Sequence, residues 1–229
     1  MPNEGLEILE RPQAPARRGT GGRPTREEAL KRDARLLDVA TQLFMERGFE
    51  GTSIDAVAET AGVSKPTVYA RYRDKRELFT AVLRERIQQF LAPISAAAEA
   101  QATDIRPTDV ETILHELSRH MLAQVSTAEC ATLQRILAAQ AIRFPELAKL
   151  AHEEGWLRAV RGVAAVLRHF HHRGQIDVED PELAADLFLN LVLGHSKRLA
   201  VHGIATDPGA EERTRKAAVK LFLNGVSVR

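Results

Sequence analysis

Apolar residues recur every three or four positions along most of this chain, which is the spacing of one face of an α-helix. The first amphipathic segments cover residues 27–47, 54–61 and about 65–72. Further helices are predicted at residues 75–100, 108–124, 128–142, 145–152, 154–172, 181–202 and 211–224. The pattern therefore predicts an all-α protein, with a three-helix domain at residues 26–75 and a larger helical domain at residues 76–229.

Capping signals set the limits of the second and third helices. Thr52 followed by Asp55 resembles a capping box at the start of the second helix. Gly62 is expected to end that helix in the left-handed conformation that glycine adopts easily. Ser64 is expected to cap the third helix, where Pro66 is harmless because first-turn amides have no helical partner. Two short helices joined by a tight turn form a helix-turn-helix.

The third helix has the two faces that a DNA recognition helix needs. One face must pack on the preceding helix, and Val68 and Tyr72 suit that role because they lie four positions apart. The other face must enter a major groove about 12 Å wide, so it needs small or polar residues. That face carries Lys65, Thr67, Ala70 and Arg71.

Basic charge is concentrated around this helix. Residues 62–76 carry five basic residues against one acid, and residues 11–35 carry eight against three, although the net charge of the whole chain is only +1. A polyanion would select such patches, while the alternative is that they are solvated helix faces. Asp74 with Glu77 resembles a second capping box, and it opens a fourth helix whose first amides favour an anion.

The N-terminal segment, residues 1–25, is rich in Pro, Gly and Arg and has no aromatic residue, so we expect a mobile basic arm. Arg17, Arg18 and Arg23 resemble arms that lie in a minor groove beside a recognition helix. The alternative is an unstructured tail that keeps the protein in solution.

Composition argues against membrane insertion and export. With 44% hydrophobic residues in 229, the chain is typical of a globular protein. The longest apolar run, residues 187–194, is interrupted by Asn190 and is far shorter than the roughly 20 residues of a membrane span. The N-terminus has no apolar signal segment, and the single cysteine, Cys130, suits a reducing compartment. We therefore expect a cytoplasmic protein with no membrane partner.

The sequence shows no catalytic machinery and no cofactor motif. It lacks a Gly-rich phosphate loop, a nucleophile elbow, an HExxH motif and paired cysteines, so we expect neither an enzyme nor a bound cofactor. His169, His171 and His172 could suggest a metal site, but basic residues in a last helical turn more often complement the helix dipole, and no metal is expected. Cys130 is interpreted as a small buried residue, with oxidant sensing as the alternative.

Two ordered motifs resemble the TetR family of bacterial transcriptional regulators. They are LFMERGFEGTSI and VAETAGVSKPTVYARYRDKRELF, and the close resemblance covers residues 35–79. The resemblance implies a homodimer, an operator of double-stranded DNA with dyad symmetry, and a small-molecule effector that weakens DNA binding. It therefore implies a ligand-responsive regulator, most simply a repressor.

The same resemblance implies a role for each matching residue. Base contacts are implied for Lys65, Pro66, Thr67 and Ala70, and contacts with the DNA backbone for Thr52, Tyr69, Arg71 and Lys75. Pro66 stands where many members of the family have glycine. The ring replaces an amide that could approach DNA, so base preferences cannot be transferred from a glycine-bearing relative.

The C-terminal part resembles the AefR-like domain found in some members of this family, on the segments RFPELAKL and RGQIDVEDPELAADLF. Dimers of this family pair two core helices in a four-helix bundle, for which residues 154–172 and 181–202 are the candidates because both are apolar on more than one side. The expected interface residues are Val160, Val163, Leu167, Leu187, Phe188 and Leu191. The alternative is that these two are core helices of a monomer.

Polar and aromatic residues scattered through the larger domain are candidates for an effector pocket. They are His115, His120, Gln134, Gln140, Trp156 and His195. Residues 76–229 are therefore expected to form the effector-binding and dimerisation domain. The alternative function is a non-DNA interaction module or an enzyme that contains an incidental helix-turn-helix.

Overall fold

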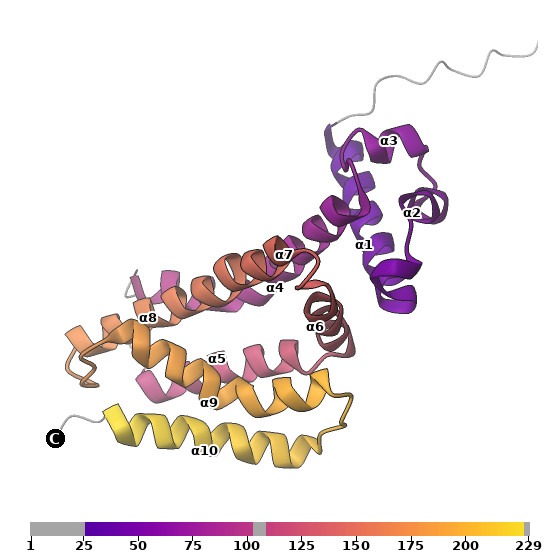
Figure 1. Cartoon of the computed structure of the whole chain (residues 1–229). Coiled ribbons are helices and arrows are strands. Elements are labelled where there is room, and N and C mark those ends of the chain that lie inside the picture. The colour runs from indigo at the N-terminus through magenta and orange to yellow at the C-terminus, as the bar shows by residue number, and fades with distance from the viewer. Residues whose placement is uncertain (1–25, 103–108, 227–229) are drawn as a thin grey trace, which may run out of the picture.

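The computed structural model describes residues 26–102 and 109–226, and every regular element within these ranges is helical (Figure 1). The elements are α1 (Arg26–Gly51), α2 (Ile54–Ala61), α3 (Lys65–Tyr69), α4 (Lys75–Ala102), α5 (Val110–Val125), α6 (Ala128–Gln140), α7 (Pro145–Leu150), the π-helical segment η1 (Ala151–Trp156), α8 (Leu157–His172), α9 (Pro181–Val201) and α10 (Pro208–Val226). The all-α prediction is confirmed. The basic arm expected at residues 1–25 lies outside the described residues.

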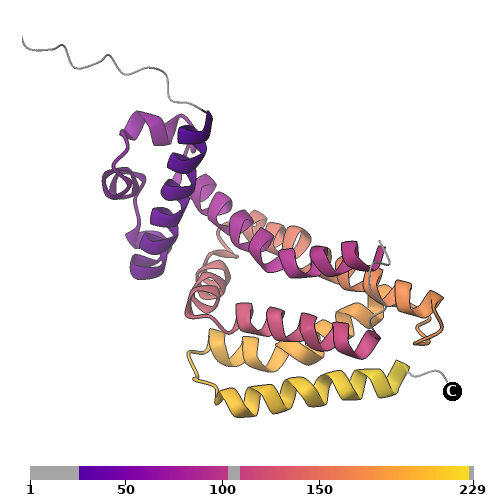
Figure 2. The same ribbon diagram turned by 180° about the vertical axis from the view of Figure 1, so that it is seen from behind.

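A long helix joins two bodies of unequal size. α1, α2 and α3 form the smaller body around the start of α4, and α4 then continues into the larger body over its length of 28 residues (Figure 1). In the larger body α4 and α8 lie along one side, α5 and α9 in the middle, and α10 along the opposite side, as the view from behind also shows (Figure 2). α6 stands at the end of the larger body that is nearest to the smaller one.

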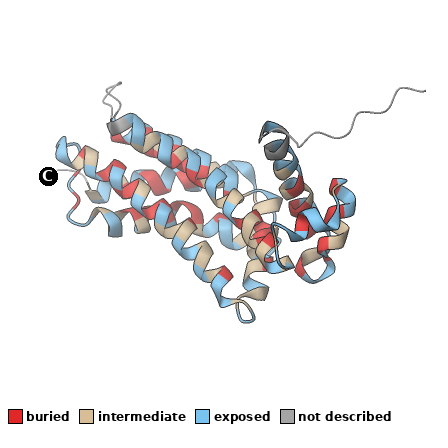
Figure 3. Ribbon diagram, turned by 90° about the horizontal axis from the view of Figure 1, so that it is seen from above, coloured by how far each residue is buried: buried red, intermediate tan, exposed pale blue. Residues whose placement is uncertain are grey.

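Each body has its own hydrophobic core. The core of the smaller body gathers side chains of α1 and α2, Val68 of α3 and the first turns of α4, and it is completed by Leu133 and Ile136 of α6 and Leu147 of α7. The core of the larger body lies between α4, α5, α8, α9 and α10, whose buried stretches are red in Figure 3. The domain boundary expected at residue 75 therefore precedes Leu78 and Phe79, which belong to the first core.

Several helices differ from the prediction in their limits, and two of these differences have a visible structural cause. The first helix, expected to end at residue 47, has a kink at Gly48, where φ is 69°, and the chain then resumes a helical turn so that α1 ends at Gly51. The helix expected at residues 154–172 has no separate start, because α7, η1 and α8 follow one another without a break. A π-helical segment takes up extra residues without ending the helix, which a 3.6-residue periodicity does not reveal.

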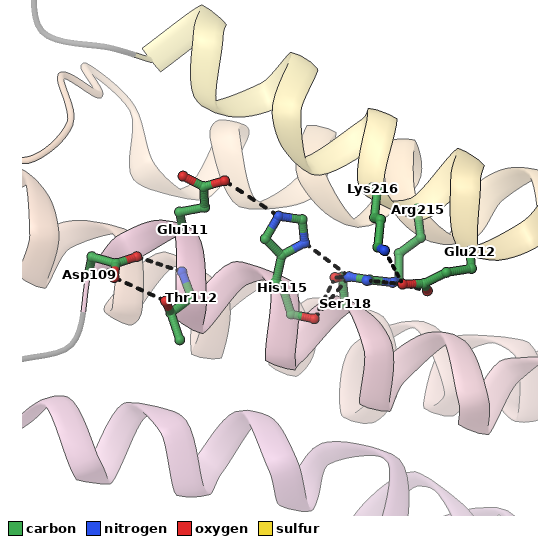
Figure 4. Close-up of polar contacts among 8 residues, drawn as sticks. All are labelled: Asp109, Glu111, Thr112, His115, Ser118, Glu212, Arg215 and Lys216. Atoms are coloured by element: carbon green, nitrogen blue, oxygen red, sulfur yellow. Dashed lines mark hydrogen bonds and ion pairs between the residues drawn. The ribbon is translucent and has the colours of Figure 1, made fainter.

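A buried arginine fixes α10 to α5 (Figure 4). The Arg215 side chain is 1% exposed and donates hydrogen bonds to Ser118 Oγ at 2.7 Å and to the His115 carbonyl at 3.0 Å. It also donates two bonds of 2.7 Å to the Glu212 carboxylate, which lower the pKa of Glu212 to about 2. Burying a guanidinium costs hydration energy, which is offset only when its N–H donors find acceptors. Here both α5 and α10 supply those acceptors.

α4 and α8 cross at a glycine. A Cβ atom added to Gly162 of α8 would lie inside the van der Waals radius of Ile94 Cγ2 of α4, and Ile94 is buried at the centre of the larger core. We predict that Gly162→Ala lowers the free energy of unfolding by about 1–3 kcal/mol, because a β-branched methyl group in a packed core cannot move aside freely.

Denaturant unfolding at a fixed protein concentration measures this effect. Gly225→Ala in α10 is the control, because no heavy atom lies within 4 Å of the added Cβ and alanine favours a helix. A Gly162→Ala protein as stable as the Gly225→Ala protein would contradict the close crossing.

Candidate nucleic-acid interface

The helix-turn-helix begins at Ser53 rather than at Thr52. Ser53 is the N-cap of α2, and its hydroxyl accepts a hydrogen bond from the Ala56 amide at 3.1 Å. Thr52 is 2% exposed, and its hydroxyl lies 2.8 Å from the Gly48 carbonyl and 3.0 Å from that of Leu43. Both carbonyls belong to the kinked end of α1, and the Thr52 hydroxyl, which has one hydrogen to donate, is turned inward toward them. The implied contact of Thr52 with the DNA backbone is therefore wrong for this conformation.

The turn between α2 and α3 follows the expected chemistry. Gly62 takes the left-handed conformation with φ 69°, and its amide bonds to the Ala58 and Glu59 carbonyls. Ser64 caps α3 by accepting a hydrogen bond from the Thr67 amide at 3.3 Å. α3 ends at Tyr69, three residues before the predicted limit, and Val68 anchors it with no exposed surface.

The outer surface of this unit presents the residues that were expected to face DNA. Tyr69 is 49% exposed. The other exposed residues of α3 and its C-terminal side are Lys65, Pro66, Thr67, Ala70 and Arg71. Their position agrees with the expected groove face, and their contacts with bases and phosphates stay predictions.

Two of the basic side chains on this surface are held by acids of neighbouring helices. Lys65 Nζ lies 2.6 Å from Asp55 Oδ2 of α2, and the hydrogen bond raises the pKa of Lys65. Arg71 pairs with Asp33 of α1. Such exposed ion pairs contribute little to stability and exchange partners readily, so a phosphate can replace either acid.

Apart from Thr52, Lys75 is the most enclosed of the expected phosphate contacts. Its side chain is 24% exposed, and Nζ lies 4.6 Å from the centre of the Phe49 ring and 3.2 Å from the Glu50 carbonyl. The Glu50 carboxylate in turn accepts a hydrogen bond of 2.8 Å from Arg143, which precedes α7. Phe144 adds a ring contact of 5.7 Å with Phe49. The segment between α6 and α7 is thus bound to the end of α1, beside Lys75.

The start of α4 differs in one detail from the predicted capping box. Asp74 Oδ1 accepts a hydrogen bond from the Glu77 amide at 2.8 Å, as predicted. In the return bond, Glu77 Oε2 accepts from the amide of Arg73 at 2.7 Å rather than from that of Asp74, and this bond lowers the pKa of Glu77. The first turn of α4 is therefore fixed close to the exposed surface of α3.

The residues expected at a dimer interface fall into two groups. Leu187 and Leu191 are 57% and 39% exposed, and Leu183 extends their row on α9 with 56% exposure. Leu183 is not among the residues expected at the interface.

The other four expected interface residues, Val160, Val163, Leu167 and Phe188, are at most 7% exposed in a single protomer. Their assignment to a dimer contact is wrong, because they form the protomer's own core. Periodicity shows that α9 has two apolar faces, but not which face is the inner one.

The six residues expected to line an effector pocket are not gathered in one place. His115 bonds to Arg215 in the contact between α5 and α10, Gln134 donates to Cys130 Sγ at 3.2 Å, and His120 and His195 are exposed. Gln140 lies at the end of α6. None of these five lines either of the two cavities described here.

Trp156 does line one of the two cavities, a surface hollow of about 380 Å³. Its Nε1 donates to Asp186 Oδ1 at 2.6 Å, and Lys197 Nζ lies 5.5 Å from the centre of its ring. His152 and Asn190 contribute to the same hollow. Of the expected pocket residues, Trp156 alone is therefore placed beside one of these cavities.

The residues considered for other chemistry have ordinary environments. Burial raises the pKa of the Cys130 thiol, and His171 Nδ1 accepts a hydrogen bond from the Val178 amide at 3.2 Å. Among residues 26–102 and 109–226, no group of three His, Cys, Asp or Glu side chains could hold a metal ion. No helix in these same ranges is long and apolar enough to cross a membrane.

Comparison with known proteins assigns both bodies. Residues 36–82 match the family described as bacterial regulatory proteins, tetR family, and residues 112–225 match the C-terminal domain of AefR-like transcriptional repressors. The chain is 30% identical over 107 residues to the HTH-type transcriptional regulator AcrR of Shigella flexneri, and the match covers 47% of each protein. The chain thus spans about half the length of this curated relative.

Solved structures match nearly the whole chain. A putative TetR-family regulator from Mesorhizobium loti is 29% identical with a TM-score of 0.80, covering 90% of this chain and all of the other. The flavonoid-responsive regulator FrrA is 31% identical with a TM-score of 0.64, covering 87% of this chain and 98% of FrrA. Since the family matches include both bodies and a relative is matched over almost its full length, this chain belongs to the TetR family of bacterial regulatory proteins, with a C-terminal domain of the AefR-like type.

Proposed function

We propose that this protein is a transcriptional repressor that binds a two-fold symmetric operator as a homodimer and is released from it by a small molecule. The observation that carries the proposal is the exposed face of α3, which is small, polar and basic and is held by a buried Val68. The match to the AefR-like repressor domain supports repression, and the flavonoid-responsive relative supports control by a ligand.

The exposed face of α3 is proposed to read bases with some residues and to bind phosphates with others. Lys65, Pro66, Thr67 and Ala70 lie where a helix in the major groove meets base edges. Tyr69, Arg71 and Lys75 surround them and are proposed to bind phosphates, which fixes the orientation of α3 without reading bases. Asp55 and Asp33, which hold Lys65 and Arg71 in the free protein, are replaced by DNA.

Dimer formation is proposed through the leucine row on α9. Leu183, Leu187 and Leu191 lie on the face of α9 opposite its buried residues, so each protomer exposes an apolar stripe along one helix. A stripe of this kind buries itself against its own copy across a two-fold axis. The axis would place two α3 helices on one face of a duplex and so double the DNA contacts.

Release by a ligand is proposed to use α6 and the segment that follows it. α6 contributes Leu133 and Ile136 to the core of the smaller body, and Arg143 and Phe144 hold the end of α1. A ligand that binds the larger body more tightly when α6 is displaced would favour that displaced state. Because α6 packs on the smaller body, the displacement would change the position of α3. Trp156 is the proposed effector contact among the residues singled out from the sequence.

The phosphate contacts lead to a prediction about salt. Tyr69→Phe and Lys75→Ala are each expected to weaken binding to all duplexes by a similar factor, because phosphate contacts carry no sequence information. Lys75→Ala should also reduce the slope of log affinity against log salt by about one unit, since one fewer counterion is released. Fluorescence anisotropy with an operator selected from random duplexes, and with an unrelated duplex, measures both effects.

Lys149→Ala provides the control, because Lys149 is 71% exposed on α7 and is assigned no DNA contact. An altered base preference with an unchanged salt slope would contradict the phosphate assignment. A wild-type protein that selects no sequence from random DNA would contradict the proposed function and favour a non-DNA interaction module.

A further inference from the structure

A cavity of about 330 Å³ lies between the start of α6, the end of α9 and the connection from α9 to α10. None of the residues expected to bind an effector lines it, and neither does Trp156. Its volume falls within the range of small-molecule sites, which is about 300–1,000 Å³. Its wall is mainly small apolar side chains, among them Ala131 of α6, Ala200 of α9 and Ile204 of the connection.

A serine hydroxyl in this wall has no partner. Ser196 of α9 is 4% exposed, lines the cavity, and makes no hydrogen bond with the part of the chain that the structure describes. The hydroxyl oxygen opens onto the cavity, where water can bond to it in the free protein and a ligand can take the place of that water. The Ser196 side chain is therefore available to a molecule in the cavity.

The charged group of the cavity is a cation without an acid. Arg135 of α6 lines the cavity, donates to the Ala200 carbonyl at 3.1 Å and to Thr132 Oγ1 at 2.7 Å, and has no carboxylate within ion-pair distance among the described residues. No Asp or Glu is part of the lining. An acid bonded to the lining is Glu211, which is not a lining residue itself but accepts a hydrogen bond of 2.7 Å from the lining residue Ser126.

The start of α6 adds to the positive potential. Ala128 is the first residue of this 13-residue helix and lines the cavity, with Thr127 as N-cap. The first amides of a helix carry partial positive charge and have no helical partner. These amides add to the attraction for an anion that Arg135 and Ser196 provide.

We propose that this cavity binds a small organic carboxylate, with its charge near Arg135 and the start of α6, a hydrogen bond from Ser196, and its apolar part against the alanines and Ile204. The charge and the hydroxyl select an anion that accepts hydrogen bonds, and the apolar wall favours a carbon skeleton over an inorganic ion.

Occupancy of this cavity would act on α6 directly. Ala131 and Arg135 of α6 line the cavity, while Leu133 and Ile136 of the same helix belong to the core of the DNA-binding body. A ligand that moves α6 by a fraction of its width therefore changes the packing beneath α1. This regulatory consequence rests on the proposed function, whereas the binding site itself does not.

The binding site is tested with benzoate as the probe and benzamide as its neutral isostere. Chemical-shift titrations of the ¹⁵N-labelled full-length protein should show saturable changes for benzoate in residues 126–135 and 196–206. Benzamide should bind at least about tenfold more weakly, because it lacks the charge that Arg135 attracts. Inorganic phosphate, titrated in parallel, should also bind more weakly, because it has no apolar part.

Three variants localise the site. Ser196→Ala should weaken benzoate binding by about three- to tenfold without loss of thermal stability, since the lost hydroxyl had no partner. Arg135→Gln should weaken it by about tenfold or more. Arg119→Gln is the charge-matched control, because Arg119 is exposed on α5 outside the cavity, and binding should be unchanged.

Several results would overturn the site. They are no saturable shift with about 10 mM benzoate, equal binding of benzoate and benzamide, phosphate binding as tight as benzoate, or full affinity in both Ser196→Ala and Arg135→Gln. Operator binding is measured separately without any probe. A protein that binds its operator but not benzoate refutes this site and leaves the proposed function standing, while the reverse result refutes only the proposed function.

Discussion

Leu187→Asp is expected to give a folded, helical monomer that no longer binds operator DNA. Leu187 is 57% exposed in the protomer, so the charge is tolerated in the monomer, but a dimer through α9 would bury it without a partner. That cost is several kcal/mol, enough to dissociate the dimer at micromolar concentration. Loss of the second α3 should then reduce operator affinity by at least about 100-fold. Sedimentation velocity, circular dichroism and anisotropy measure the three properties.

Two matched substitutions separate the interface from the core. Leu221→Asp on α10 replaces a leucine of similar exposure, 63%, outside the leucine row and should leave the dimer and operator binding intact. Phe188→Asp, one position from Leu187, should instead unfold the protein, because Phe188 has no exposed surface and lies in the core of the larger body. If Leu187→Asp and Leu191→Asp both remained dimeric, the leucine row would not be the dimer contact.

Arg215→Ala is expected to lower the free energy of unfolding by about 3 kcal/mol. The substitution leaves a cavity between α10 and α5, and it removes one donor each to Ser118 Oγ and to the His115 carbonyl. Among the described residues, these two atoms then keep a side-chain hydrogen bond only with each other. Arg215→Met keeps most of the volume and should cost less, about 1 kcal/mol, because buried charges replaced by apolar groups of similar size are often nearly neutral.

Lys216→Ala is the control for this prediction, since Lys216 is 64% exposed and should change stability by less than about 0.5 kcal/mol. Denaturant unfolding of all three variants is compared at one protein concentration, because a dimer's stability depends on it. If Arg215→Met were as destabilising as Arg215→Ala, the hydrogen bonds would outweigh the packing. If neither variant differed from wild type, α10 would not be fixed to α5 by this residue.

The helix-turn-helix could be predicted in detail because its signals are local. Gly62 and Ser64 act through hydrogen bonds within a few residues of themselves, and both lie as expected. Val68 is buried, as its position on the apolar face of the third helix predicted. Thr52 was misplaced because its hydroxyl bonds nine residues back to Leu43, across a kink that a capping motif does not reveal. The enclosure of Lys75 by Phe49 and Glu50 depends on a contact between α1 and α4 and was likewise not readable.

The effector and dimer residues were less predictable because they depend on which side of a helix faces inward. Val163 and Leu187 are both apolar residues of amphipathic helices, yet the first is fully buried and the second is more than half exposed. Ser196 and Arg135 gave no signal in the sequence, since a serine and an arginine at helical spacing are ordinary. Their meeting in one cavity requires α6 and α9, some 60 residues apart in the chain, to lie side by side.

The sequence by itself determined the helical class, the helix-turn-helix with its caps, the family and the presence of two apolar faces on α9. All of these depend on periodicity or on residues close together in the chain, where sterics and hydrogen bonding act locally. The tertiary structure alone decided which apolar face is core, that α6 belongs to the DNA-binding core, and that Arg215 is buried against α5. Each of these is set by the packing of distant helices, where the gain from burying surface depends on the partner and not on the segment itself.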